Sequence, residues 1–588
     1  MTITRKEWVR VIGFALFAAA LTTLPYLLAW QSQTADRAFS GALFGVEDAN
    51  SYLAKMRAGA QGNWSFSLFY TPEPTDAEAF VFMPYVLSGQ IIGAVVQDDA
   101  ALPVALMVGY QIMRVVFGIV LVLTMYRFIA RFIDHERVRY NALVLASLAG
   151  GLGWITLFVP FGARAMPDLT IPEGFTFLIL YGLPHLALGR AAMLGGLILL
   201  MPAPPAPVVI HGDGIAPPVP RRVIYAGILF NVVGICVPFY LAVIYVILGV
   251  WGLARWAAER RFPFELARRA VPAAAMTIPL FVYNAWIFLR NPAFAQWSAQ
   301  NILTSPPMFE YVIAYLPLGA FAVIAGRWAW NQAREKGQHA LLIGWLIAVP
   351  ILVYLPINVQ RRLAEGVIVP LAILAAWGIR QLIWRDQIPE DAPPLPDDPR
   401  KRRAYQRGRT LRTLLIIFFL CSTTVVWIST GALASIIRNS PAYRDGAELR
   451  AFAWLEANSE PGSRVIAAWT TGNALPVYTD LRPMLGLGPE TLLPENKEAL
   501  IDRYYWGMLD QVGRGALYDL PCTNQWMRDP VPVSAECRVR YVLWGEAERE
   551  LFPPDVTPVF PVGDDVRLVY EDGSYQIYEV MRDGVSQP

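Results

Sequence analysis

Two acidic residues, Glu47 and Asp48, follow the first long apolar run of the chain and begin a short amphipathic pattern. A carboxylate held there can take the proton from a hydroxyl group while the oxygen attacks an activated carbon, which is general-base chemistry. Asp48 is also suited to cap a helix that begins near Ala49, because aspartate is a preferred N-cap residue. The two roles are compatible, and we carry both forward as expectations.

Two further residues share a helix face with Asp48. Tyr52 and Lys55 recur at spacings that bring them to that face. We therefore expect both side chains to line the substrate cavity in which the acids act. The apolar neighbours of Tyr52 predict that this short helix rests on a membrane surface.

Arg361 and Arg362 are candidates for binding phosphate. They lie in a short polar loop, residues 358–366, between two apolar runs. A guanidinium group can bind two phosphate oxygens at once. The alternative is that both side chains extend to lipid head groups. Their loop is an exception to the positive-inside bias, which makes two arginines there costly unless they are used and favours phosphate binding.

Three ionisable residues, Arg114, His185 and Arg190, lie inside apolar runs. A charge within a membrane is costly and usually faces a cavity or a partner. We expect Arg114 and Arg190 to contribute to the phosphate site and His185 to line the cavity. Hydrogen bonding between helices is the alternative for all three, and for His185, which follows Pro184, simple packing is the more common role.

Composition identifies the environment in which these residues must be positioned. Of the 588 residues, 55% are hydrophobic and 16% are charged, whereas soluble domains contain about 25% charged residues. The formal net charge is only +2, so no basic excess indicates a nucleic-acid partner. The chain is therefore predicted to be an α-helical polytopic membrane protein.

Apolar runs of about 20 residues are long enough to cross a bilayer as helices. Residues 223–252 are too long for one straight span and contain Pro238 near the middle, which predicts a hairpin of two helices. With that hairpin, about 11 spanning helices are expected. The runs are residues 11–30, 102–126, 142–160, 175–201, 223–252, 271–289, 311–328, 340–357, 367–384 and 414–437.

Basic residues accumulate in alternate loops, which indicates the orientation because positive residues resist translocation. The clusters lie in residues 127–139, 260–269, 327–336 and 400–412. The N-terminus is then cytoplasmic, and residues 31–101 form a long first extracytoplasmic loop. Residues 438–588 also lie outside. Without the hairpin, every later loop changes sides.

The C-terminal region, residues 438–588, reads as an extracytoplasmic α/β domain, and residues 1–437 as the transmembrane domain. Strand patterns on both sides of Asp572 and Gly573 predict a tight hairpin. Cys522 and Cys537 are close enough in sequence to form a disulfide, which agrees with an oxidising compartment.

The acidic pair, the long first loop and the outside C-terminal domain together resemble the polytopic glycosyltransferases of the GT-C type. This group includes the dolichyl-phosphate-mannose protein mannosyltransferases and the lipid A aminoarabinose transferases. The motif is carried by Glu47 and Asp48 with Tyr52, Met56, Gly59, Gly62 and Trp64, and residues 80–96 match a membrane-surface helix. The likeness covers the chain in architecture, but its motifs are short.

The resemblance implies transfer of a sugar from a polyprenyl-phosphate donor to a hydroxyl group of a lipid, glycan or protein, outside the cytoplasmic (inner) membrane. Asp48 is then the first choice for the base and Glu47 the second, with Arg361 and Arg362 on the donor phosphate. Some members of the family use a divalent cation such as Mg²⁺ or Mn²⁺, but the sequence shows no compact carboxylate cluster to hold one.

Two alternatives belong to other classes. A transporter or flippase of lipid-linked saccharides would also need a membrane cavity with cations, but it predicts inverted repeats, and none is evident in the sequence. A catalytically inactive scaffold of the same fold is the second alternative. The identities of the sugar and acceptor, and the oligomeric state, do not follow from these residues.

Overall fold

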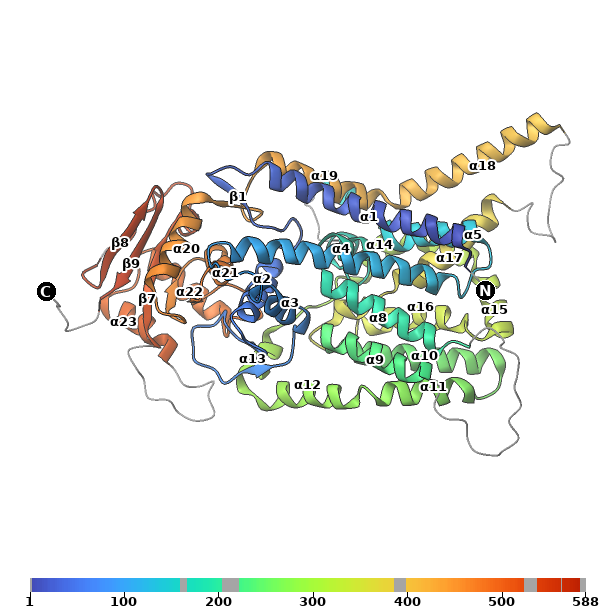
Figure 1. The fold of residues 1–588 in the computed structure, drawn as a ribbon, viewed down its shortest axis with the longest axis horizontal. Coiled ribbons are helices and arrows are strands. Elements are labelled where there is room, and N and C mark those ends of the chain that lie inside the picture. The colour runs from blue at the N-terminus through green and yellow to red at the C-terminus, as the bar shows by residue number, and fades with distance from the viewer. Residues whose placement is uncertain are drawn as a thin grey trace. The chain divides into compact units, whose positions relative to one another are not determined.

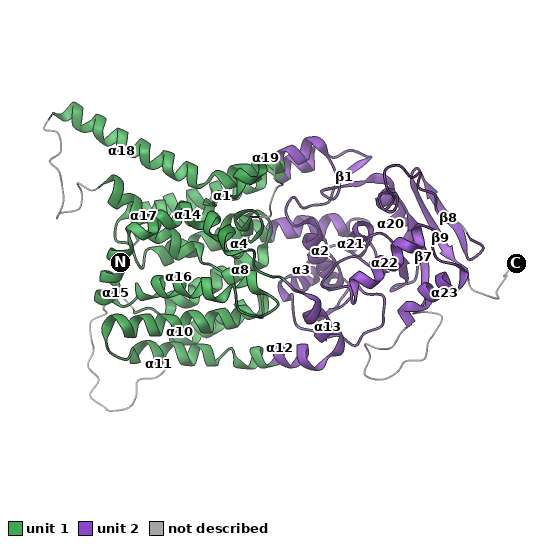
Figure 2. Ribbon diagram, turned by 180° about the vertical axis from the view of Figure 1, so that it is seen from behind, with its two compact units in different colours: residues 1–25, 113–282, 303–431 green, residues 26–112, 283–302, 432–588 purple. Residues whose placement is uncertain are grey.

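Helices dominate the structure, a computed structural model that describes residues 3–158, 166–202, 221–384, 398–522, 537–561 and 563–581. The chain forms two compact units, shown in different colours in Figure 2. Unit 1 contains residues 1–25, 113–282 and 303–431, and unit 2 contains residues 26–112, 283–302 and 432–588. The predicted division of the chain at residue 438 stays a prediction, because compactness does not show which segments fold independently.

Three described helices are long and apolar enough to cross a membrane, namely α1 (Arg5–Gln31), α4 (Leu102–Ile129) and α10 (Tyr240–Glu259). Counting each bent pair as one span raises the number among the described residues to six. Apolar, membrane-suited helices are therefore confirmed, whereas the count of about 11 stays a prediction. The bent pairs are α11 (Phe264–Ala275) with α12 (Ile278–Arg290), α14 (Met308–Ile324) with α15 (Gly326–Lys336), and α18 (Pro399–Leu420) with α19 (Ser422–Ile437).

The long run 223–252 is broken, as its length and Pro238 predicted. Helix α9 (Arg221–Cys236) ends before that proline, and α10 begins at Tyr240 and contacts α9. Proline interrupts a helix because it lacks a backbone donor and its ring clashes with the preceding turn. The interruption thus converts one overlong run into two helices within unit 1 (Figure 1).

Other runs differ from the expected single helices. Residues 175–201 form α7 (Thr176–Gly182) and α8 (Pro184–Leu200), with Pro184 at the start of α8. Helix α5 (Glu136–Leu148) ends before Gly150 and Gly151, and the 3₁₀ helix η1 (Gly153–Phe158) follows. Glycine favours such an end because it loses the most backbone entropy in a helix. The remaining apolar helices of this unit are α16 (Ala340–Leu352) and α17 (Ile368–Ile383).

Unit 2 contains a five-stranded mixed sheet in the order β6-β5-β7-β9-β8. Strand β5 (Arg464–Ile466) pairs in parallel with β6 (Arg482–Pro483) and β7 (Val539–Trp544), while β9 (Tyr575–Val580) pairs antiparallel with β7 and with β8 (Val566–Asp572). The predicted hairpin is confirmed, and Gly573 supplies its positive φ of 58°.

Both faces of this sheet are buried. Along β7, Val542 and Trp544 join one apolar core, and Tyr541 and Leu543 join another, because successive side chains point to opposite faces. The first core includes α22 (Pro494–Tyr505) and α23 (Gln511–Asp519). The second includes α20 (Gly446–Asn458) and α21 (Trp469–Tyr478).

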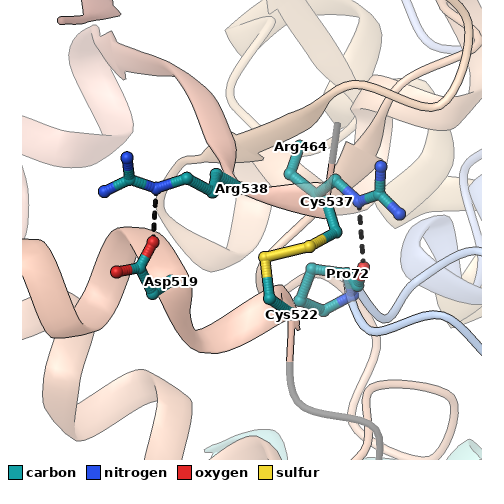
Figure 3. Close-up of a disulfide and its surroundings, with 6 residues drawn as sticks. All are labelled: Pro72, Arg464, Asp519, Cys522, Cys537 and Arg538. Atoms are coloured by element: carbon teal, nitrogen blue, oxygen red, sulfur yellow. Dashed lines mark hydrogen bonds and ion pairs between the residues drawn. A yellow bond between two sulfur atoms is a disulfide. The ribbon is translucent and has the colours of Figure 1, made fainter. Parts of the chain in front are cut away.

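Cys522 and Cys537 form a disulfide in unit 2 (Figure 3). It joins the end of the short helix η4 (Leu520–Cys522) to the segment that enters β7. Beside it, Arg464 Nε donates a hydrogen bond to the Pro72 carbonyl oxygen at 3.1 Å. The disulfide therefore lies next to a contact between the sheet and the first loop.

The first loop also carries two helices that pack closely, α2 (Val46–Ala60) and α3 (Met83–Gly93). A Cβ added at Gly89 would lie 1.9 Å from the Met56 carbonyl oxygen, and one at Gly59 would lie 2.2 Å from that of Val86. Both positions therefore require glycine. The loop is tied to the C-terminal segment by pairing of β1 (Arg37–Phe39) with β4 (Tyr443–Asp445).

Candidate functional site

Helix α2 presents the acidic pair at its first turn. The helix begins at Val46, after Gly45 in the left-handed conformation with φ 55°. The expectation that Asp48 caps a helix starting near Ala49 is therefore wrong, because glycine adopts that conformation without strain and the helix starts earlier. Glu47 and Asp48 are both exposed. Asp48 is thus free of a capping role and near the positive end of the helix dipole.

Glu47 is held more firmly than Asp48. Its backbone carbonyl accepts a hydrogen bond from Asn473 Nδ2 at 3.3 Å. Partial burial raises the pKa of its carboxyl group, and a hydrogen bond with Trp469 opposes this shift. The two acids therefore occupy different surroundings although they are adjacent in sequence.

The next turns of α2 are anchored by buried polar contacts. Asn50 Nδ2 donates to Asn473 Oδ1 at 2.8 Å, and both residues are buried. Lys55 Nζ lies 2.7 Å from Glu490 Oε1, with side-chain exposures of 0% and 5%. Burial lowers the pKa of Lys55, and the Glu490 carboxylate opposes that shift. These contacts determine where the first turn of α2, and hence Asp48, is held within unit 2.

Aromatic rings surround the rest of this helix face. The Tyr52 ring stacks on Tyr85, with centroids 4.5 Å apart and planes 10° apart. Lys55 Nζ lies 4.3 Å from the Phe82 ring centroid and 5.0 Å from that of Phe66. Tyr52 and Lys55 therefore share a face, as their spacing predicted, but Lys55 uses its charge within the protein.

Two glycine-containing segments, residues 469–473 and 486–491, contribute to this anchoring. Residues 469–473 form the start of α21, and a Cβ at Gly472 would lie 1.9 Å from the Leu485 carbonyl oxygen. In the second segment, Thr491 Oγ1 donates to the Tyr70 carbonyl oxygen at 2.8 Å. Gly472 thus serves close packing, which a local turn pattern does not reveal.

A buried ion pair in the same unit joins Arg444 on β4 to Glu448 on α20. Arg444 Nη1 donates to Glu448 Oε1 at 3.0 Å, and Arg444 Nη2 donates to the Thr470 carbonyl oxygen at 2.9 Å. Burial raises the pKa of Glu448 to about 7, with Arg444 opposing and Glu548 adding to the shift. Glu448 therefore changes its charge near neutral pH.

The raised pKa of Glu448 predicts a pH-dependent stability. An acid whose pKa rises on folding stabilises the fold fully below its unfolded value, here 4.5, and loses that contribution as pH rises through about 7. Relative to Glu448→Gln, the parent should lose up to about 3 kcal/mol of unfolding free energy across this window. Thermal unfolding of the full chain from pH 5 to 8 measures the difference, and parallel curves would contradict the assignment.

In unit 1, Arg361 and Arg362 lie on the 3₁₀ helix η2 (Gln360–Ala364) and are partly exposed. Arg362 Nε is 3.7 Å from Glu173 Oε1, and its guanidinium lies 5.8 Å from the Phe239 ring centroid. The backbone N–H of Arg361 donates to the Leu303 carbonyl oxygen. The Arg361 side chain is in no ion pair with the described residues, and its charge acts on the Glu173 carboxylate from a longer range.

Arg190 is fully buried in a dense set of contacts in unit 1. Its Nε and Nη2 bind the two Glu365 oxygens at 2.6 and 3.0 Å. Its Nη1 donates to Thr176 Oγ1 at 2.9 Å, and its Nη2 also donates to the Glu173 carbonyl oxygen at 2.6 Å. The structure thus brings Arg190 and Arg362 together around Glu173. Direct phosphate binding by Arg190 stays a prediction.

Arg114 and His185 lie elsewhere in unit 1. Arg114 donates to the Leu180 carbonyl oxygen at 3.2 Å and to Thr23 Oγ1 at 3.0 Å, and only 1% of the residue is exposed. His185 lies in the first turn of α8 and is buried. Both surroundings are compatible with the helix-packing alternative.

Sequence reasoning missed the acidic partners Glu173, Glu365 and Glu490. A signal existed for Glu365. An arginine buried in a membrane requires a counter-ion, and Glu365 is the acidic residue of the loop 358–366, which was already expected to share a site with Arg190. Nothing in the local pattern connects Lys55 with Glu490, which is 435 positions away.

Across the described ranges, no group of three or more His, Cys, Asp or Glu side chains is arranged to hold a metal ion. A divalent cation such as Mg²⁺ or Mn²⁺ stays a prediction, because Mg²⁺ is usually held by one or two carboxylates together with waters and substrate phosphates.

No protein-family model and no curated protein matches this sequence. Solved structures do match its fold. The oligosaccharyltransferase of Archaeoglobus fulgidus in the apo form matches with a TM-score of 0.53 and 12% identity, covering 92% of this chain and 70% of that chain. ArnT from Cupriavidus metallidurans, bound to undecaprenyl phosphate, matches with a TM-score of 0.46 and 14% identity, covering 99% of each chain. The likeness to the oligosaccharyltransferase confirms the predicted GT-C resemblance at the level of fold.

Proposed function

We propose that this chain is a membrane glycosyltransferase that transfers a sugar from a polyprenyl-phosphate donor to a hydroxyl acceptor. The observation that carries the proposal is the fold shared with an oligosaccharyltransferase over 92% of the chain. Fold alone does not define a reaction. The exposed carboxylates at the start of α2 and the partly exposed guanidinium of Arg361 supply the groups that the reaction needs.

The proposed step is a direct displacement at the sugar carbon. The acceptor oxygen attacks that carbon, its proton passes to the Asp48 carboxylate, and the bond from the carbon to the phosphate oxygen breaks. The electron pair of that bond leaves with polyprenyl phosphate. Direct attack inverts the configuration at the carbon. Glu47, which the Trp469 hydrogen bond restrains, is the second choice for the base.

Arg361 and Arg362 are proposed to bind the donor phosphate and to stabilise the charge that develops on it. Arg362 is positioned by Glu173, and Glu173 in turn contacts Arg190 through its backbone. The contacts of Arg190 with Glu365 hold this loop, and Arg361 offers its guanidinium fork to the phosphate. Arg190 stays a proposed contributor to the phosphate site. Tyr52, Lys55 and His185 remain proposed cavity residues, and Arg114 remains a proposed contributor to the phosphate site.

Replacing Arg361 by glutamine should raise the KM for the donor about tenfold, because a charge-assisted hydrogen bond contributes roughly 1.5–3 kcal/mol. The matched control is Arg290→Gln, which removes an exposed positive charge from the end of α12. Initial rates at varied donor concentration measure both variants. Equal KM values for the two variants would remove Arg361 from the phosphate site.

The direct test of the function is transfer by the full-length protein in liposomes. A panel of polyprenyl-phosphate sugars labelled in the sugar is supplied, and the products are separated by solubility and mass. A transferase releases unlabelled polyprenyl phosphate and labels a second molecule. A transporter moves the intact labelled donor across the bilayer, and an inactive scaffold does neither, so either result would overturn the proposal.

The finer topology belongs to this proposal as well. We propose about 11 spans, a cytoplasmic N-terminus in the inner membrane, and an extracytoplasmic α/β domain over residues 438–588. The disulfide between Cys522 and Cys537 supports the last of these, because disulfides persist in oxidising compartments. The basic clusters at residues 127–139 and 400–412 support a cytoplasmic placement of the loops that contain them.

A further inference from the structure

Unit 1 contains a cavity of about 800 Å³ that none of the proposed catalytic residues lines. Its walls come from α1, α4, α5, α17 and α18, and α18 diverges from the other helices toward its N-terminal end (Figure 1). A second cavity of about 410 Å³ shares His135 and Arg380 with the first. Both are lined partly by the basic segment 127–139, which the sequence predicts to be cytoplasmic.

The lining of the larger cavity is mostly apolar. Phe14, Phe17, Tyr140 and Leu414 contribute to its walls, and Phe17 and Leu414 are more than half exposed. Its volume lies in the range of roughly 300–1,000 Å³ that suits an organic molecule rather than a bare anion. The walls therefore favour a ligand that has an apolar part.

The charges around the two cavities do not balance. Arg10 pairs with Glu136, Arg139 with Glu7 at 2.6 Å, and Lys336 with Asp134 at 3.4 Å. These pairs use all the acidic residues that line the cavities. Within the described part of the chain, Arg137 and Arg380 are in no ion pair, so two positive charges remain uncompensated.

Two buried polar atoms at the junction of the cavities also lack a partner. Arg380 Nε and His135 Nδ1 are buried and make no hydrogen bond with any described residue. Such atoms normally find a partner, because leaving one unsatisfied costs about 1–3 kcal/mol. Among the described residues, the contact made by the Arg380 guanidinium is a cation–π contact with Trp377, whose ring centroid lies 5.1 Å from the guanidinium carbon. The junction is thus built to receive an anion.

We propose that this cavity binds a lipid with a phosphate head group, with the phosphate between Arg380, His135 and Arg137 and the acyl or prenyl chain along Phe14 and Phe17. A phosphate carries one or two negative charges and several acceptor oxygens, which matches the two uncompensated arginines and the two unpartnered nitrogens. The site is separate from Asp48 and Arg361. Its lining residues come from unit 1 and include none of the residues proposed for catalysis.

Binding is tested on the full-length protein in phosphatidylcholine nanodiscs, without any activity assay. Dioctanoyl phosphatidic acid, dioctanoyl phosphatidylcholine and inorganic phosphate are titrated separately, and bound species are counted by native mass spectrometry. The variants are Arg380→Gln, Arg380→Lys and Arg137→Gln. The matched control is Arg402→Gln, because Arg402 is exposed on α18 and lines neither cavity.

The parent should bind phosphatidic acid in preference to the other two probes. Arg380→Gln should weaken this binding about tenfold or more. Arg380→Lys, which keeps the charge without the fork, should bind the lipid more tightly than Arg380→Gln but less tightly than the parent. Arg402→Gln should bind it as the parent does. Equal binding of phosphatidylcholine would show apolar packing alone and overturn the proposal. Displacement of the lipid by equimolar inorganic phosphate would identify a free-phosphate site and also overturn it.

The variant Arg137→Gln tests the proposal independently if Arg380→Gln fails to fold. Arg137 is exposed, so its replacement leaves the packing of α17 intact. Arg137→Gln should weaken phosphatidic acid binding by several fold, with a melting temperature equal to that of the parent. Unchanged binding in this folded variant would overturn the proposal.

Discussion

Replacing Asp48 by asparagine is expected to reduce kcat for sugar transfer by at least about 100-fold, because general-base catalysis contributes roughly 10²–10⁴-fold. Asparagine has nearly the same shape but cannot accept the acceptor proton. Asp48 is exposed and does not cap α2, so the fold should be unaffected. Single-turnover transfer in liposomes measures the chemical step separately from donor binding.

Glu47→Gln is the matched control for Asp48→Asn. It removes an equal charge one position earlier on the same helix turn. If Asp48 is the base, the control should retain most of the rate, and the donor KM should be similar in both variants. A larger loss in Glu47→Gln would transfer the base role to Glu47. Full activity in both variants would exclude the acidic pair from catalysis.

The second large effect is expected at the buried pair of Lys55 and Glu490. Replacing Glu490 by glutamine should lower the stability of the α2 region by about 3–5 kcal/mol, because it leaves a buried charge without its counter-ion. Amide hydrogen exchange of α2 in the full-length protein measures the change. The surface pair of Arg450 and Asp572 in the same unit provides the control, and Asp572→Asn should alter exchange very little.

A double variant separates charge pairing from packing. Lys55→Met with Glu490→Leu removes both charges and retains apolar volume among the rings of Phe66 and Phe82. It should exchange more slowly than Glu490→Gln, because replacing a buried pair by apolar residues is often neutral. If the double variant were less stable than either single variant, the pair would be acting through packing, and the charge argument would be wrong.

Placement of α2 links this stability to function. The contacts of Asn50 and Lys55 with Asn473 and Glu490 hold the helix whose first turn carries Asp48. A catalytic group must be held within a fraction of an ångström of its working position. Loss of the buried pair should therefore lower transfer activity even though neither residue touches the proposed reacting atoms.

The features that the sequence predicted depend on local pattern. The apolar runs, the interruption at Pro238 and the hairpin at Gly573 are present in the structure. Each depends on the properties of adjacent residues: hydrophobic length, the missing donor of proline, or the positive φ of glycine. The misplaced cap at Asp48 has a related cause, since the helix begins one turn earlier because Gly45 adopts a left-handed conformation.

By itself, the sequence determined that this protein is a helical membrane chain, and it marked Glu47, Asp48, Arg361 and Arg362 as residues suited to the proposed chemistry. Only the tertiary structure decided which charges are used within the protein, pairing Lys55 with Glu490 and Arg190 with Glu365. Segment type follows from neighbouring residues, whereas the partner of a buried charge depends on chain segments hundreds of positions apart that only folding brings into contact.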